Sequence, residues 1–247
     1  MHAVRIVSVV AAVAALAACG MKDGRSSDGS GIAAKSGPDG SRSFAATGFT
    51  GVELEGPDNV VVTRGDSFSV VATGPQEELD KLRIEVENGV LVVGRQSEKM
   101  SWGNHKGATV KVVLPRLDKA ELTGSGDLSI DSASGDKVAV ALAGSGNLGI
   151  ASVTAKELDV ALAGSGDLSI KGGKADKGEV ALAGSGDIDV KGVTLTTADI
   201  SIAGSGDVDA TATATADVSV LGSGDVRLGG GAKCDSSELG SGTVSCS

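Results

Sequence analysis

The stretch Val-Ala-Leu-Ala-Gly-Ser-Gly-Asp-Ile-Asp-Val at residues 180–190 recurs, with small changes, through the second half of this 247-residue chain. Four intervals between successive Gly-Ser-Gly elements are 20 residues long, and the last two are 18. The elements begin at Gly124, Gly144, Gly164, Gly184, Gly204, Gly222 and Gly240. A fixed period of this length is typical of a solenoid, in which each repeat buries its apolar face by stacking on its neighbours.

Apolar residues alternate with small or polar ones inside each unit. In residues 180–190 the even positions hold Val, Leu, Ile and both glycines, whereas the odd positions hold Ala, Ser and Asp. Because side chains of a strand point to opposite faces in turn, one face points inward throughout. We expect the glycines to mark a corner with no room inside for a side chain, and Ser and Asp to point outward. The units therefore predict an all-β fold, a parallel β-helix with coils of 18–20 residues and the right-handed sense.

The sequence of the first half of the chain predicts short strands. Alternating apolar runs are each closed by Gly, Pro, Asn or Asp, which is typical of strands between turns. These runs are 52–54, 60–63, 68–71, 84–86, 90–93 and 110–114. Residues 75–82 are a helical candidate, since Pro75 and then acidic residues stand at the start. The polar stretch 97–107 predicts a surface loop, and its Trp102 and His105 are candidates for surface contact.

The N-terminus predicts export. Arg5 precedes an apolar run, residues 6–15, that is too short to span a bilayer. The following Leu16-Ala17-Ala18-Cys19 resembles the lipobox of bacterial lipoproteins, which implies cleavage after residue 18 and lipidation of Cys19. Gly20 is not the Asp associated with inner-membrane retention, so the resemblance implies the outer membrane, on its periplasmic or surface face. The alternative is an ordinary secretory signal with a chance cysteine.

Composition separates the mature chain into parts. Residues 19–43 are rich in Gly, Ser and Asp and predict a disordered tether. We therefore expect a lipoprotein signal peptide at 1–18, the tether, an N-terminal β portion at 44–118, and β-helix repeats with a C-terminal cap at 119–247. The net charge is −10 and becomes more negative when Arg5 is removed. An acidic surface disfavours nucleic acid and anionic lipid headgroups as partners, so membrane attachment would come from the lipid.

Two cysteines remain once Cys19 is acylated. Cys234 and Cys246 lie near each other in an exported chain, which predicts a disulfide, with two unpaired thiols as the alternative. When Gly240 is aligned on Gly222, Ser236 and Glu238 take inward positions that hold valine in the repeat before. Polar residues there indicate the end of the core, and a disulfide would fix its open edge.

Three stretches resemble a known family. Residues 49–54 with 59–66, residues 112–117, and the run of Gly-Ser-Gly-Asp units resemble the family described as putative auto-transporter adhesin, head GIN domain. The resemblance covers about residues 44–247. It implies an exported β-helical protein of the cell envelope, and it brings no catalytic residues with it.

Residues that carry chemistry elsewhere have structural interpretations here. The literal Gly-x-Gly-x-x-Gly match at 144–149 has no helix after it, as dinucleotide binding would require. The outward corner residues could bind calcium, but we expect an Asx-type turn in which each carboxylate caps N–H groups of its own corner. This column comprises Asp127, Asn147, Asp167, Asp187, Asp207, Asp225 and Thr243. We therefore predict no metal and no cofactor.

The sequence favours a binding function over catalysis. The mature chain has one histidine and no Gly-x-Ser-x-Gly elbow, so we expect no catalytic residues and no enzyme. The leading hypothesis is a non-enzymatic, lipid-anchored envelope β-helix, an adhesin or interaction module whose envelope or surface ligand is unknown. One alternative is a carbohydrate-binding or carbohydrate-active β-helix; another is a periplasmic sensor or scaffold.

Overall fold

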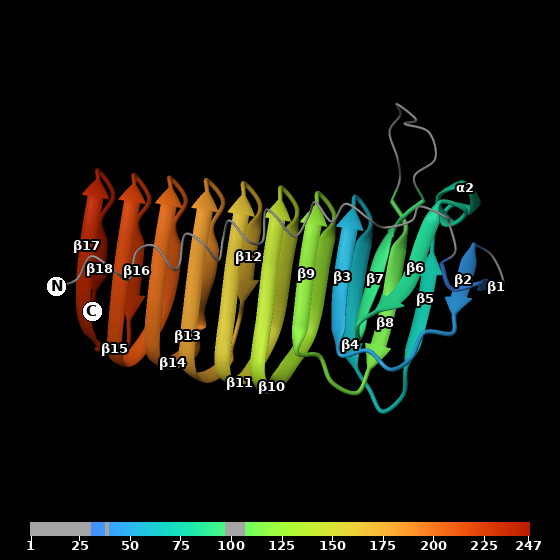
Figure 1. Cartoon of the computed structure of the whole chain (residues 1–247), viewed down its shortest axis with the longest axis horizontal. Helices are drawn as coiled ribbons and strands as arrows, with labels where there is room; N and C mark the ends of the chain where they lie inside the picture. The colour runs from blue at the N-terminus through green and yellow to red at the C-terminus, as the bar shows by residue number, and fades with distance from the viewer. Residues whose placement is uncertain (1–30, 38–39, 97–106) are drawn as a thin grey trace.

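The computed structural model describes residues 31–37, 40–96 and 107–247 as one elongated β-solenoid, whose coils lie side by side along the long axis (Figure 1). All the strands of the described residues belong to one 18-stranded sheet. The prediction of an all-β parallel β-helix is confirmed. The strands do not separate the N-terminal β portion from the repeats, because one ladder of hydrogen bonds runs through both.

Each repeat forms one coil that pairs in parallel with the next. Leu142 pairs with Leu162, which pairs with Leu182, and the same 20-residue register holds along most of each coil. The strands of the repeats are β10 (Asp127–Gly144), β11 (Asn147–Gly164), β12 (Asp167–Ile170), β13 (Gly173–Gly184), β14 (Ile188–Gly204), β15 (Val208–Gly222), β16 (Val226–Gly229), β17 (Lys233–Gly240) and β18 (Val244–Cys246). Identical spacing along the sequence thus becomes identical position around the coil.

The side chains of the repeats point inward and outward as the alternation in the sequence predicts. Within the repeated units the inward residues form a continuous apolar core, and the corner Ser and Asp side chains are mostly exposed; the outward Ala141 and Ala181 are buried as well. The inward residues that we predicted are at most 2 % exposed: Leu162, Leu182, Ile188 and Ile202. The outward ones are exposed: Ser165, Asp167, Ser185 and Asp187. The predicted register is confirmed.

The N-terminal strands build the first coil and close its end. Strands β3 (Gly51–Gly56) and β4 (Asn59–Arg64) pair in parallel with β9 (Lys119–Gly124) and β10. Around them lie β5 (Ser69–Thr73), β6 (Leu82–Glu87), β7 (Val90–Arg95) and β8 (Thr109–Leu114). The pairs β5–β8 and β6–β7 are antiparallel, so the solenoid ends in a cap of different topology. The six predicted strands are all present.

The helical candidate is confirmed but shorter than predicted. Helix α2 spans Gln76–Leu79, and Pro75 stands at its N-cap. It ends early because Leu82 begins β6, whose antiparallel pairing with β7 requires an extended backbone.

The expected tether is wrong in its last part. Strand β1 (Ala34–Ser36) lies inside the stretch 19–43, strand β2 (Ser41–Phe44) begins inside it, and β2 pairs with β5. The physical reason is the exposed edge of the cap: strands there leave unpaired backbone groups, and a polar segment that pairs with them satisfies those groups. Residues 19–30 lie outside the described residues.

The corner glycines are required for a reason other than the one we expected. A Cβ on Gly184 would lie 2.0 Å from the carbonyl oxygen of Gly164, and a Cβ on Gly186 would lie 2.0 Å from that of Gly166. Gly184 also has a φ of +138°, which L side chains rarely adopt. The obstacle is therefore the backbone of the preceding coil, not a lack of room inside. This close approach lets the Ser185 N–H donate to the Gly164 carbonyl at 2.9 Å.

Candidate functional site

The first corner of the solenoid carries a buried carboxylate. Gly56 pairs with Gly124 and Asn59 with Asp127, so residues 56–59 occupy the place of a Gly-Ser-Gly-Asp corner. Asp58 then stands where later corners have their second glycine. Among the described residues no earlier corner precedes it in the stack, and its side chain is fully buried against residues of the N-terminal cap.

Arg95 is the counterion of Asp58. Its Nε and Nη2 donate to the two carboxylate oxygens of Asp58 at 2.8 and 2.6 Å, and its Nη1 donates to Glu78 at 2.5 Å. The hydrogen bonds from Arg95 to Asp58 and Glu78 raise the pKa of the guanidinium, with Asp58 as the largest cause, so Arg95 stays charged. The backbone N–H of Ala108 donates to the same Asp58 carboxylate at 2.8 Å. We call Asp58, Glu78, Arg95 and Ala108 the loop-base cluster.

The loop-base cluster joins the two ends of segment 97–106. Arg95 ends β7 and is followed by Gln96 before the segment, and Ala108 comes after Gly107 beyond it, so Asp58 binds residues on both flanks of the segment. Trp102 and His105, the predicted surface contacts, belong to the segment and lie outside the described residues. The sequence pattern did not predict this cluster. A signal for it is present in the sequence: when residues 56–59 are aligned with 124–127, Asp58 takes an inward position.

Arg95→Lys should destabilise the protein by about 1–2 kcal/mol, because lysine keeps the charge but cannot form the forked pair with buried Asp58. Urea unfolding followed by circular dichroism measures the change. Arg116→Lys is the matched control, since Arg116 pairs with Asp118 at an exposed site and should change stability by less than about 0.5 kcal/mol. Equal effects of the two substitutions would contradict the role of the cluster.

The corner carboxylates bond across coils, which corrects the expected Asx turn. Asp187 accepts from the backbone N–H of Asp207 at 3.0 Å, and Asp207 accepts in the same way from Asp225 at 3.0 Å. Asp225 accepts from the N–H of Thr243 at 2.9 Å and from its hydroxyl at 2.8 Å. The cause is the stacking of the coils, which places these three carboxylates beside the backbone N–H of the next coil. The Thr243 hydroxyl and then its N–H lower the pKa of Asp225.

Asp187→Asn should be neutral or mildly stabilising. The amide oxygen accepts the same N–H of Asp207, and one of several neighbouring negative charges is removed. Asn147 already occupies an equivalent place, where its side-chain amide donates to Asp127 at 2.8 Å. Thermal unfolding with and without a chelator measures the effect, and we expect no shift with the chelator. A large fall in melting temperature that added calcium reverses would contradict this interpretation. Among residues 31–37, 40–96 and 107–247, no three His, Cys, Asp or Glu side chains form a candidate metal site.

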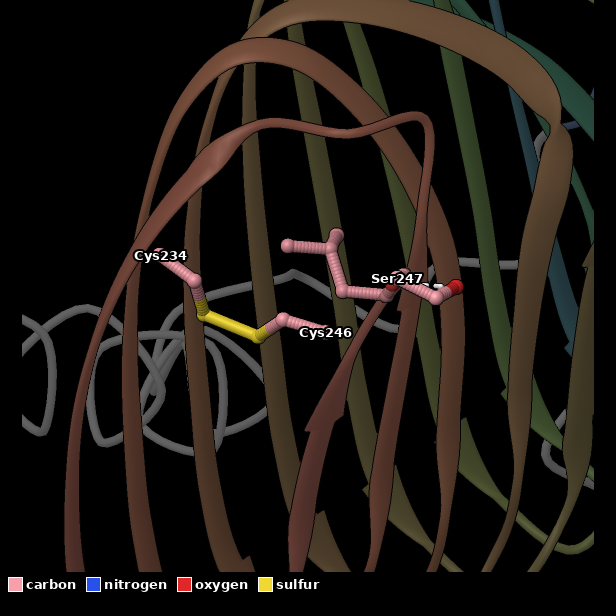
Figure 2. The surroundings of a disulfide bond; sticks show 4 residues. Cys234, Cys246 and Ser247 are labelled. Atoms are coloured by element: carbon pink, nitrogen blue, oxygen red, sulfur yellow. Dashed lines mark hydrogen bonds between the residues drawn. A yellow bond between two sulfur atoms is a disulfide. The ribbon is translucent and has the colours of Figure 1, made fainter.

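The last coil leaves the core uncovered. Ser236 pairs with Val218 and Glu238 with Val220, and both polar side chains are exposed, so the predicted end of the core lies here. Cys234 on β17 and Cys246 on β18 are joined by a disulfide with their Cα atoms 6.5 Å apart. Figure 2 shows that this bond connects the two strands of the terminal coil. It therefore holds together the terminal coil, which has no further coil beyond it in the part of the chain that the structure describes.

Cys19, the predicted lipidation site, lies outside the described residues. Within the part of the chain that the structure describes, no helix is long and apolar enough to cross a membrane.

Comparisons with known proteins agree with the fold. A family model described as putative auto-transporter adhesin, head GIN domain, matches residues 48–232. A solved structure of a putative adhesin from Bacteroides fragilis is 23 % identical, with a TM-score of 0.79 over 84 % of this chain and 96 % of that one. A putative adhesin from Parabacteroides merdae is 18 % identical (TM-score 0.66; 84 % and 95 % covered). A putative lipid binding protein from Parabacteroides distasonis is 23 % identical (TM-score 0.64; 84 % and 96 % covered). No curated protein matches.

Proposed function

Because this chain belongs to the family described as putative auto-transporter adhesin, head GIN domain, we propose that it is a non-enzymatic, lipid-anchored protein of the bacterial cell envelope that uses its β-helix for attachment. The family suggests a place in the envelope or at the cell surface. We infer three things beyond what the family suggests: the lipid anchor, the location at the outer membrane and the role in attachment.

The observation that carries the proposal is the repeated outer surface of the coils. Corner Ser side chains recur at the same position of each repeat and are exposed, and their backbone is fixed by hydrogen bonds to the coil before. Strand pairing sets the coil spacing at about 4.8 Å, so equivalent side chains form straight columns. A rigid array of equivalent groups favours several weak contacts at once over one enclosed reaction site.

The periodic acidic groups support a structural role over a catalytic one. Asp187, Asp207 and Asp225 each accept a backbone N–H of the following coil. The Thr243 hydroxyl and then its N–H also lower the pKa of Asp225, which makes this carboxylate a poor general acid. The proposed protein therefore acts by binding.

The anchor supplies a direct prediction. Cys19→Ala removes the acyl acceptor, so palmitate labelling should be lost and the protein should leave the membrane fraction, because its acidic surface gives no electrostatic attraction to anionic lipid. Metabolic labelling followed by membrane fractionation measures both. Cys234→Ala is the control and should stay labelled. If the Cys19 variant continued to partition with membranes, the anchor would be wrong.

Attachment is tested on whole cells. Deleting the gene, or covering the coils with antibody fragments, should reduce adherence to the surfaces that wild-type cells colonise or should weaken the envelope. Antibody fragments against an unrelated lipoprotein are the control. Unchanged adherence and unchanged envelope integrity in both experiments would contradict the proposal.

A further inference from the structure

A change of coil length forms a ledge on the lateral surface. Between Asp189 and Thr194 of β14 lie four residues, whereas one residue lies between their partners Asp209 and Thr211 of β15. The extra residues include the exposed Lys191 and Gly192, and the Lys191 carbonyl accepts from the Thr211 hydroxyl at 2.8 Å. The two 18-residue coils that follow have no such projection. The surface beyond Lys191 is therefore stepped.

An open groove of about 650 Å³ lies along this step. Its lining comes from successive coils and includes Lys191, Asp209, Thr211, Arg227, Gly229 and Ser245. These six residues occupy outward positions of the coils, so the groove opens to the side of the solenoid; the buried Ala210, Val226 and Leu228 also border it. The corner columns of Asp and Thr reach its border at Asp225 and Thr243.

Charges in the groove are paired with each other. The Arg227 guanidinium lies 3.2 Å from Asp209 and 3.3 Å from Asp207, and Lys191 Nζ lies 2.7 Å from Asp189. Lys191 Nζ also lies 3.7 Å from Asp209, which is thus placed between two cations. A hydrogen bond to Asp189 is the largest cause that raises the pKa of Lys191. A hydrogen bond to Asp209 is the largest cause that raises the pKa of Arg227. The groove therefore offers fixed donors and acceptors without a large charge of one sign.

We propose that this groove binds a neutral oligosaccharide. Adjacent sugar hydroxyls act as donors and acceptors together, and Asp209 beside Arg227 and Lys191 offers both. The hydroxyls of Thr211 and Ser245 add further groups of both kinds. Coils spaced about 4.8 Å apart place these groups in successive steps along which an extended glycan chain would lie. The inference rests on the proposed attachment function and names the class of ligand.

Two pairs of variants test the groove. Gly229→Leu fills it, and the substitution fits because a Cβ there would first meet the Thr211 hydroxyl, at 3.8 Å. Gly149→Leu is its control on a distant coil, where the nearest atom is the Ser169 hydroxyl at 3.7 Å. Arg227→Ala removes the shared donor. Its control is Arg116→Ala, since the two arginine side chains are 58 % and 57 % exposed and both pair with Asp.

The full-length, detergent-solubilised protein is applied to an array of neutral and anionic oligosaccharides, and the affinity of each bound glycan is measured by calorimetry. We expect neutral oligosaccharides to bind and both groove variants to weaken binding on the order of tenfold, with the controls unchanged. Circular dichroism checks that all four variants are folded.

Three outcomes would overturn the inference: no glycan binding, binding of anionic glycans alone, or wild-type affinity in both groove variants. The proposed function is tested separately by adherence of cells. Adherence that needs the gene but not the groove would keep the attachment role and reject the oligosaccharide site.

Discussion

Gly184→Ala should destabilise the protein by about 3 kcal/mol and open the coils around it. The added methyl would lie 2.0 Å from the Gly164 carbonyl oxygen, and the φ of +138° is unfavourable for alanine. The neighbouring coil cannot move away without breaking the hydrogen bond from Ser185 to Gly164. Urea unfolding monitored by circular dichroism measures the loss, and hydrogen exchange locates it.

Gly149→Ala is the matched control for this prediction. Gly149 belongs to the same repeats, but a Cβ there would lie 3.7 Å from the nearest side chain and meet no backbone. Stability should stay within about 0.5 kcal/mol of wild type. A Gly184 variant as stable as the Gly149 variant would show that the coils do not approach as closely as described.

Leu182→Asp should cost about 4 kcal/mol, because it puts an unpaired charge among apolar side chains. Leu182 is 1 % exposed and stacks between Leu162 and Ile202. In a solenoid each coil contacts only its neighbours, so the loss should be local, with protease cleavage near the substituted coil. Limited proteolysis followed by mass spectrometry locates the opened segment.

Ala183→Asp is the control, since residue 183 is next in sequence but takes an outward position and is only half-buried. It should leave the proteolysis pattern unchanged. If Ala183→Asp opened the coil and Leu182→Asp did not, the inward register would be the reverse of the one described.

The repeats could be predicted because sequence spacing and spatial spacing coincide in a parallel β-helix. Once Leu162 and Leu182 are 20 residues apart in identical surroundings, in-register stacking follows, and burial of one face fixes which residues point inward. The same reasoning located the end of the core at Ser236 and Glu238. It did not reveal that the corner glycines leave room for the backbone of the preceding coil, because a period along the chain carries no information on the distance between coils.

The N-terminal cap was less predictable because its contacts do not repeat. Asp58 and Arg95 are 37 residues apart, and no local pattern pairs them. Strands β1 and β2 have the composition of a flexible linker and become ordered by pairing with the edge that the cap would otherwise expose. The groove beside Lys191 was not predicted for a related reason. The sequence shows that the last two repeats are 18 residues long where the others are 20. It does not show at which point of the coil the shortening lies, and so it does not locate the step in the surface.

Adherence of complemented deletion cells tests the attachment role most directly. A strain that lacks the gene is complemented with the wild-type chain, with Cys19→Ala, or with an empty vector, and the cells retained on a colonised surface under flow are counted. We predict that the wild-type chain restores retention, whereas the Cys19→Ala protein, exported in equal amount, leaves retention at the level of the empty vector. Equal retention of all three strains would contradict the account.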